Sequence, residues 1–214
     1  MNDLAAQIRE RYLQTLERIA VAARSVGRRP EEVRLVVVTK AQPLHVVQAV
    51  IEAGAPILGE NYPEEAVEKI QVLSSAKVDW HMIGHVQSRK ADLVSSHFSM
   101  LHSLDSLKLA NRLERFCSES GRRLPVLLEF NVGGEESKFG WSASDESRWP
   151  ALLADIEAVM ALPHLDVRGL MSMPPLAADP ESSRPYFQVL SRLRAYLVGH
   201  FPSTAWQELS IGTS

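Results

Sequence analysis

The chain has 214 residues, of which 45% are hydrophobic and 23% are charged, and its formal net charge is −3. This composition is typical of a globular protein with one sizeable core, and the apolar runs fall short of the roughly 20 residues that a membrane-spanning helix needs. The negative charge argues against bulk nucleic-acid binding, which requires a basic face. The single cysteine, Cys117, cannot form an internal disulfide and follows Leu113 at helical spacing, so we expect a packed thiol in a reducing cytoplasm.

The chain begins with a predicted amphipathic helix, because apolar residues from Leu4 to Ala23 recur every three or four positions and form one stripe that ends near Gly27. Apolar runs then alternate with helical patterns, without a linker. The predicted strands are 33–40, 56–60, 78–84, 98–104, 125–132, 167–171 and 206–211. The predicted helices between them are 43–53, 63–74, 86–94, 106–119, 144–161 and 182–199. This alternation predicts one domain, residues 1–214, with the α/β architecture of a (β/α)8 barrel.

Lys40 ends the first predicted strand, directly after the run Leu35, Val36, Val37, Val38 and Thr39. Such a run is typical of a strand buried on both faces of a parallel sheet, and α/β folds keep their chemistry at the carboxyl ends of these strands. The low-dielectric edge of the core disfavours the ammonium form and frees a lone pair for Schiff-base formation with a carbonyl compound. A lysine that simply extends into solvent is the alternative for this segment.

Polar residues follow the other predicted strands as well. The segments at these ends are 59–62, 84–90, 102–105, 129–140, 172–175 and 210–214. Because the strands are parallel, their ends meet at one rim, where we expect a site. The small and hydroxyl residues of 210–214 could cradle a phosphate, although most glycine-rich and serine-rich turns are only turns.

The strand count leaves the predicted barrel incomplete. Seven strands are predicted, and the sequence ends at Ser214, directly after the seventh, whereas a barrel of this type closes with eight. An open parallel sheet would expose unpaired edges. We therefore expect an eighth strand in a C-terminal segment that this sequence does not include, in preference to a barrel left open.

The motifs at these strand ends resemble those of the YggS/PROSC family of pyridoxal phosphate homeostasis proteins. The segments that carry the resemblance are 35–40, 59–62, 80–84, 87–88, 131–140, 169–171 and 209–210, in order through nearly the whole chain. The resemblance implies a fold-type III barrel, similar to the N-terminal domain of alanine racemase, with pyridoxal 5′-phosphate (PLP) held as a Schiff base on Lys40. It also implies a role in intracellular PLP homeostasis without an established catalytic reaction, apo forms of PLP-dependent enzymes as candidate recipients, and a monomeric protein.

The chain departs from the family pattern in three places. Arg89 stands where the family has an asparagine in Leu-Gln-Ser-Asn-Lys, and 209–214 reads Leu-Ser-Ile-Gly-Thr-Ser in place of Leu-Ser-Met-Gly-Met-Ser. The family's final Arg-Ile-Gly strand, which supplies part of the phosphate clasp, is absent from this sequence. We therefore expect weakened PLP binding by these 214 residues.

Besides Lys40, the predicted cofactor-binding residues are Asn61, His81, Ser210, Gly212, Thr213 and Ser214. Asn61 would contact the cofactor or order the rim, or else cap the following turn. His81 would stack on the pyridine ring, or else be a core histidine bonded to a main-chain carbonyl. The last four residues are candidates for the phosphate. A metal site at His81 and His85 is not predicted, because Gly84 interrupts the strand and a third ligand is lacking.

Two classes of function remain open, and a third is weaker. The first is a PLP-binding regulatory or carrier protein without catalytic residues. The second is a PLP-dependent racemase or decarboxylase; racemisation needs a base on each face of the substrate, and the racemase relatives supply the second base from another domain. The third is a Schiff-base aldolase in which Lys40 attacks a sugar phosphate without PLP. The first is favoured, because this sequence offers no opposing base.

Overall fold

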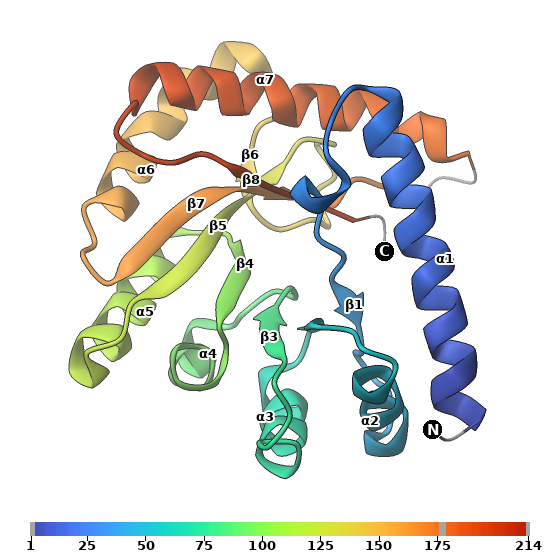
Figure 1. Ribbon diagram of the computed structural model, residues 1–214. Coiled ribbons are helices and arrows are strands. Elements are labelled where there is room, and N and C mark those ends of the chain that lie inside the picture. Colours follow the sequence, from blue (N-terminus) through green and yellow to red (C-terminus); the bar gives the residue numbers. More distant parts are fainter. Residues whose placement is uncertain (1–2, 176–178, 213–214) are drawn as a thin grey trace. The chain divides into compact units, whose positions relative to one another are not determined.

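The computed structural model describes residues 3–175 and 179–212, and the chain divides into two compact units between His81 and Met82. Helices and strands alternate along both units (Figure 1). None of the helices in the described part of the chain is long and apolar enough to cross a membrane.

The first unit contains a long N-terminal helix followed by three strands, with a helix after each of the first two. Its elements are α1 (Asp3–Ser25), η1 (Pro30–Glu32), β1 (Val37–Val38), α2 (Leu44–Glu52), β2 (Ile57–Glu60), α3 (Pro63–Val72) and β3 (Asp79–Met82). Strands β1 and β2 are parallel, with Val37 opposite Leu58 and Val38 opposite Gly59. Strand β3 begins where the Asp79 amide donates to the carbonyl of Pro56, at 2.9 Å.

Helix α3 starts as its sequence predicts and turns one side of its surface inward. Pro63 occupies its first turn, where the missing N–H would have no partner in any case, and Glu64 and Glu65 face the positive end of the helix dipole. The buried residues Pro63, Ala66 and Lys69 are three apart and share one side of the helix. A lysine therefore lies on the face that packs inward.

The second unit is a longer βα succession. Its elements are η2 (Ser88–Lys90), α4 (Ala91–His97), β4 (Met100–Leu104), α5 (Leu107–Ser120), β5 (Leu124–Asn131), β6 (Trp141–Ser142), η3 (Glu146–Leu152), α6 (Leu153–Met160), β7 (Leu165–Ser172), η4 (Pro180–Ser183), α7 (Arg184–His200) and β8 (Glu208–Ile211). The strand order is β4-β5-β7-β8, all parallel, and the short β6 pairs with β5. Figure 1 shows β5 and β7 side by side, with β8 beside β7.

One face of the second unit's sheet carries an apolar layer followed by a polar one. Met100, Leu127 and Met171 form a buried cluster, with Met173 packed against it. Because side chains alternate along a strand, the residues two positions later, His102 and Glu129 among them, lie on this same face nearer the carboxyl ends. Polar groups therefore line the end of the sheet at which parallel folds place their sites.

The predicted α/β succession is confirmed, including the extra N-terminal helix and seven strands in βα alternation among the described residues. Three details differ. The first strand is shorter than predicted, Val37–Val38, although the Thr39 amide still donates to the carbonyl of Gly59 in β2. The predicted helix 144–161 begins as the 3-10 segment η3, which contains Pro150. Strand β6 was not predicted, since two residues carry no periodicity. The single domain stays a prediction.

Candidate functional site

Lys40 lies in a turn just beyond β1 and is half-buried. The turn spans residues 39–42 and is closed by the Gln42 amide, which donates to the Thr39 carbonyl at 3.1 Å. Its third residue, Ala41, has φ 57 and is the one non-glycine among the described residues with a positive φ. A left-handed alanine costs about 1–2 kcal/mol, and strain of this kind concentrates at functional sites. Lys40, the predicted Schiff-base residue, therefore lies in a turn with a strained backbone.

Thr39, the residue before Lys40, is fixed by a buried ionic network. Its hydroxyl donates to Glu60 Oε1 at 2.7 Å, and Lys69 Nζ donates both to the same Oε1, at 2.8 Å, and to the Thr39 carbonyl, at 3.1 Å. Glu60 is fully buried and Lys69 is 9% exposed. Glu60 Oε2 is buried without a hydrogen-bond partner. Charges this deep persist only when paired, so the network is a fixed part of the strand end.

The two other predicted residues of the first unit lie on neighbouring strands. Asn61 follows β2 and is half-buried, and the cap position of α3 falls on Tyr62 instead. His81 is buried in β3, and its pKa is lowered to about 4, chiefly by burial, with Arg34 adding to the shift and Asp79 opposing it. The imidazole is therefore neutral near pH 7. Whether Asn61 and His81 contact a cofactor stays a prediction.

Ser210 is the predicted phosphate residue whose contacts are best defined. It lies in β8 opposite Met171, and its hydroxyl is hydrogen-bonded to His102 Nδ1 at 2.8 Å. Gly212 is exposed, and a side chain there would meet no atom within 4 Å. Thr213 and Ser214 lie outside the described residues. A phosphate site at 210–214 therefore stays a prediction that rests on a positioned hydroxyl at Ser210.

Glu129 is a buried carboxyl in β5 that sequence reasoning assigned no role. It is 6% exposed, and its Oε2 has no hydrogen-bond partner. Its pKa is raised to about 7, chiefly by burial and also by the carboxylate of Asp105, while Lys138 acts in the opposite direction. The polar layer thus contains an acid that exchanges its proton near neutral pH.

Hydrogen bonds and stacking hold the loops around this layer. Asn131 Nδ2 donates to the Glu135 carbonyl at 2.7 Å, and its Oδ1 accepts from the Gly134 amide at 2.8 Å. The ring of His85 stacks on Phe139, with centroids 3.6 Å apart. The polar loops at this end of the second unit are therefore ordered by contacts within the unit.

His85 is also paired with an acid, which bears on the metal alternative. Its Nδ1 lies 2.7 Å from Asp105 Oδ2. Within residues 3–175 and 179–212, no three histidine, cysteine, aspartate or glutamate side chains gather in a way that could hold a metal ion.

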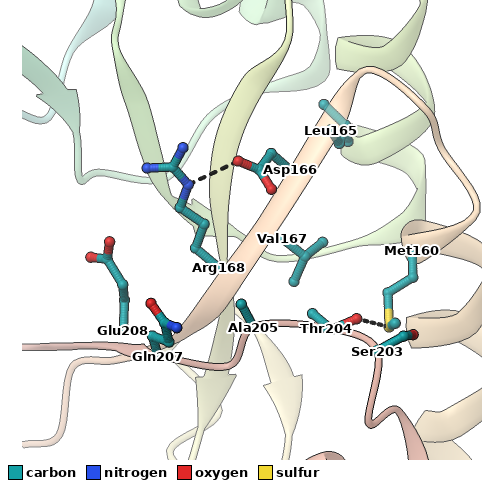
Figure 2. Close-up of a pocket in the computed structure, with 10 residues that line it drawn as sticks. All are labelled: Met160, Leu165, Asp166, Val167, Arg168, Ser203, Thr204, Ala205, Gln207 and Glu208. Carbon is teal, nitrogen blue, oxygen red and sulfur yellow. Dashed lines mark hydrogen bonds and ion pairs between the residues drawn. The ribbon is translucent and has the colours of Figure 1, made fainter.

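A groove of about 470 Å³ lies at the other end of the second unit's sheet (Figure 2). Its lining residues are Met160, Leu165, Asp166, Val167, Arg168, Ser203, Thr204, Ala205, Gln207 and Glu208. Arg168 is paired within the groove to Asp166, with Nε and Oδ2 2.9 Å apart. The groove adjoins the start of β7 and the chain that leads into β8, at the amino ends of the strands, whereas parallel folds bind ligands at the carboxyl ends. It is not the candidate site.

Sequence reasoning gave no individual role to four polar residues, Glu60, Lys69, His102 and Glu129, although all but Lys69 fall in the predicted rim segments. A signal existed for two of them. Lys69 falls three residues after Ala66 on the stripe that buries α3, and Glu129 interrupts an aliphatic strand between Leu128 and Phe130. A charged residue at a core position marks a paired or functional group.

The sequence and the fold are similar to those of known proteins. The family model described as alanine racemase, N-terminal domain, matches residues 14–209. A relative from Vibrio alginolyticus named pyridoxal phosphate homeostasis protein is 36% identical over 192 residues, which cover 88% of this chain and 79% of the relative.

Solved structures agree. PipY of Synechococcus elongatus PCC7942 without PLP has a TM-score of 0.78 at 31% identity, covering 86% of this chain and 83% of that one. PipY with PLP bound gives 0.73 at 30% identity, covering 89% and 87%. Alanine racemase from Corynebacterium glutamicum has a TM-score of 0.65 at 17% identity, covering 97% of this chain and 52% of the racemase, a likeness of fold alone. The predicted fold class, that of the alanine racemase N-terminal domain, is confirmed.

Proposed function

The chain belongs to the alanine racemase N-terminal domain family and, within it, to the pyridoxal phosphate homeostasis proteins, and from that premise we propose that it binds PLP through a Schiff base on Lys40 and serves intracellular PLP homeostasis. The observation that carries this proposal is the strained turn that presents Lys40 at the carboxyl end of β1. The relatives' names and the PLP-bound PipY structure support the cofactor.

The residues of the predicted site suit such a cofactor. When bound, PLP supplies an aldehyde carbon to which the Lys40 amine adds with loss of one water molecule. His81, neutral near pH 7, is suited to lie against an aromatic ring. Asn61 would order the same part of the site. Ser210, Gly212, Thr213 and Ser214 are proposed to hold the phosphate, where hydroxyls and main-chain amides are the appropriate donors.

The role that we propose is carrying, with apo forms of PLP-dependent enzymes as recipients, by a monomer in the cytoplasm. The free, buried thiol of Cys117 agrees with a reducing compartment, and the net charge of −3 agrees with a partner other than nucleic acid. The alternative is a PLP-dependent racemase or decarboxylase, which activity assays distinguish from a carrier.

Trapping with borohydride tests the Lys40 assignment. Protein mixed with PLP is expected to turn yellow, and reduction is expected to fix the cofactor on one peptide that contains Lys40. Lys40→Ala is expected to abolish this fixation with little loss of stability, because the side chain is only half-buried. Lys77→Ala, which removes an exposed lysine of the same unit, is the matched control and is expected to retain it. An adduct mapped to another lysine would overturn the assignment.

A further inference from the structure

The turn that presents Lys40 has one anchoring atom, the carbonyl oxygen of Thr39. This oxygen accepts two hydrogen bonds, one from the Gln42 amide, which closes the turn, and one from Lys69 Nζ, each at 3.1 Å. The turn's third residue, Ala41, has φ 57. Turns with a left-handed third residue strongly prefer glycine there. An alanine in that place persists only where surrounding contacts hold the turn.

The contacts that hold the turn come from Glu60 in β2 and Lys69 in α3. Thr39 follows β1 directly and begins the turn 39–42 that presents Lys40. The Thr39 side chain points to the face that meets α3, since its hydroxyl donates to Glu60 Oε1 and Lys69 Nζ donates to the same atom. With its amide donating to Gly59 at 2.9 Å, every polar group of Thr39 is bound.

Stability alone gives little reason for an ion pair at this depth. Glu60 is fully buried and Lys69 is 9% exposed, and a buried pair often contributes no more to stability than a well-packed apolar pair of the same volume. What the pair provides that an apolar pair cannot is a directed donor on the Thr39 carbonyl. That donor acts one peptide away from Lys40.

We propose that the Glu60–Lys69 ion pair is a positioning device: it fixes the Thr39 carbonyl, holds the strained turn 39–42, and so sets the direction in which Lys40 presents its amine. Lys69 and Glu60 are positioning residues and form no bond to the cofactor. The inference rests on the proposed function, because it gives Lys40 its role.

The experiment compares Lys69→Met with Lys77→Met, the same change at an exposed lysine of the same unit. The first readout is the affinity for pyridoxal, measured as the fraction fixed on Lys40 by borohydride. The second is hydrogen exchange of the Gln42 amide in cofactor-free protein. Losing this buried charge-assisted bond is expected to weaken pyridoxal binding roughly ten- to hundredfold and to accelerate Gln42 exchange by a similar factor. Lys77→Met is expected to change neither.

A second substitution separates positioning from general destabilisation. Ala41→Gly relieves the left-handed strain, so in the Lys69→Met background it is expected to restore pyridoxal binding at least about threefold. On its own it is expected to change binding less than about twofold. A structural role for Lys69 elsewhere in the unit predicts no such recovery, because glycine at position 41 would only add flexibility.

Two further comparisons distinguish a failure to fold from a failure to bind the cofactor. If Lys69→Met fails to fold, Glu60→Gln/Lys69→Met removes both charges, leaves no unpaired carboxylate, and is subject to the same two expectations. Unchanged Gln42 exchange, or no recovery with Ala41→Gly, overturns the positioning role. If the unsubstituted protein fails to fix PLP on Lys40, the proposed function falls, while the exchange of Gln42 still decides whether the ion pair holds the turn.

Discussion

The ionisation of the buried Glu129 makes the free energy of unfolding depend on pH. Its pKa in the folded protein is raised from 4.5 to about 7, first by burial and then by Asp105. Between these pH values the folded protein binds a proton that the unfolded chain has already released. Folding stability therefore falls as the pH rises from about 4.5 to 7 and is level above that window, a total loss of about 3 kcal/mol from this group.

Glu129→Gln removes this ionisation and keeps the shape of the side chain. At pH 8 the free energy of unfolding is expected to rise by about 2–3 kcal/mol, and its slope between pH 4.5 and 7 to flatten. Urea unfolding at pH 5 and pH 8 measures both. Glu136→Gln, at an exposed position seven residues later, is the control and is expected to leave the profile unchanged. An equal loss of stability at both pH values would show that Glu129 is ionised and paired in the folded state.

Residues such as Glu129 and Lys69 also mark how far the sequence could predict the site. The position of Lys40 just after the first strand was predictable, because an apolar run requires only local information, while its role as the Schiff-base residue stays a prediction. The partners of Thr39 were not, because Glu60 and Lys69 meet it through packing of α3 on the strands. The φ of Ala41 was not predictable either, since an alanine in that conformation contradicts its local preference.

At the scale of elements, regular alternation was predictable and short irregular pieces were not. Strands β4, β5 and β7 agree with the predicted ranges within about two residues, because apolar runs of that length have a clear period. Strand β6, with two residues, and the 3-10 segment η3 have none. The loop between β5 and β6 is shaped by Gly140, whose φ of +96 and close approach to Glu129 depend on the packed strand.

Gly140→Ala tests that close approach, with Gly121→Ala as the matched control. Both glycines have positive φ, +96 and +64, but a Cβ at Gly140 would lie 2.5 Å from the Glu129 carbonyl oxygen, whereas a Cβ at Gly121 would meet nothing within 4 Å. Gly121→Ala is expected to lower the free energy of unfolding by about 1 kcal/mol, from backbone strain alone. Gly140→Ala is expected to cost about 1–3 kcal/mol more, because the loop must move off β5. If urea unfolding shows the same loss of stability for Gly140→Ala as for Gly121→Ala, the loop moves away from β5 at no cost.

At the scale of the whole molecule, the similarity to alanine racemase is one of fold. The likeness spans 97% of this chain and 52% of the Corynebacterium glutamicum racemase. The remainder of the racemase has no counterpart among these 214 residues. The shared part accounts for the βα scaffold.

Racemisation requires a proton to leave one face of the substrate carbon and to return on the other, so it needs a base on each side. Lys40 can serve one face only. We therefore expect the PLP-loaded protein to show no racemisation or decarboxylation above free PLP across a panel of amino acids, measured by chiral chromatography and amine release. Lys40→Ala provides the background. Racemisation that disappears in Lys40→Ala would show that a second base exists, and turnover of either kind would place the protein among the PLP enzymes.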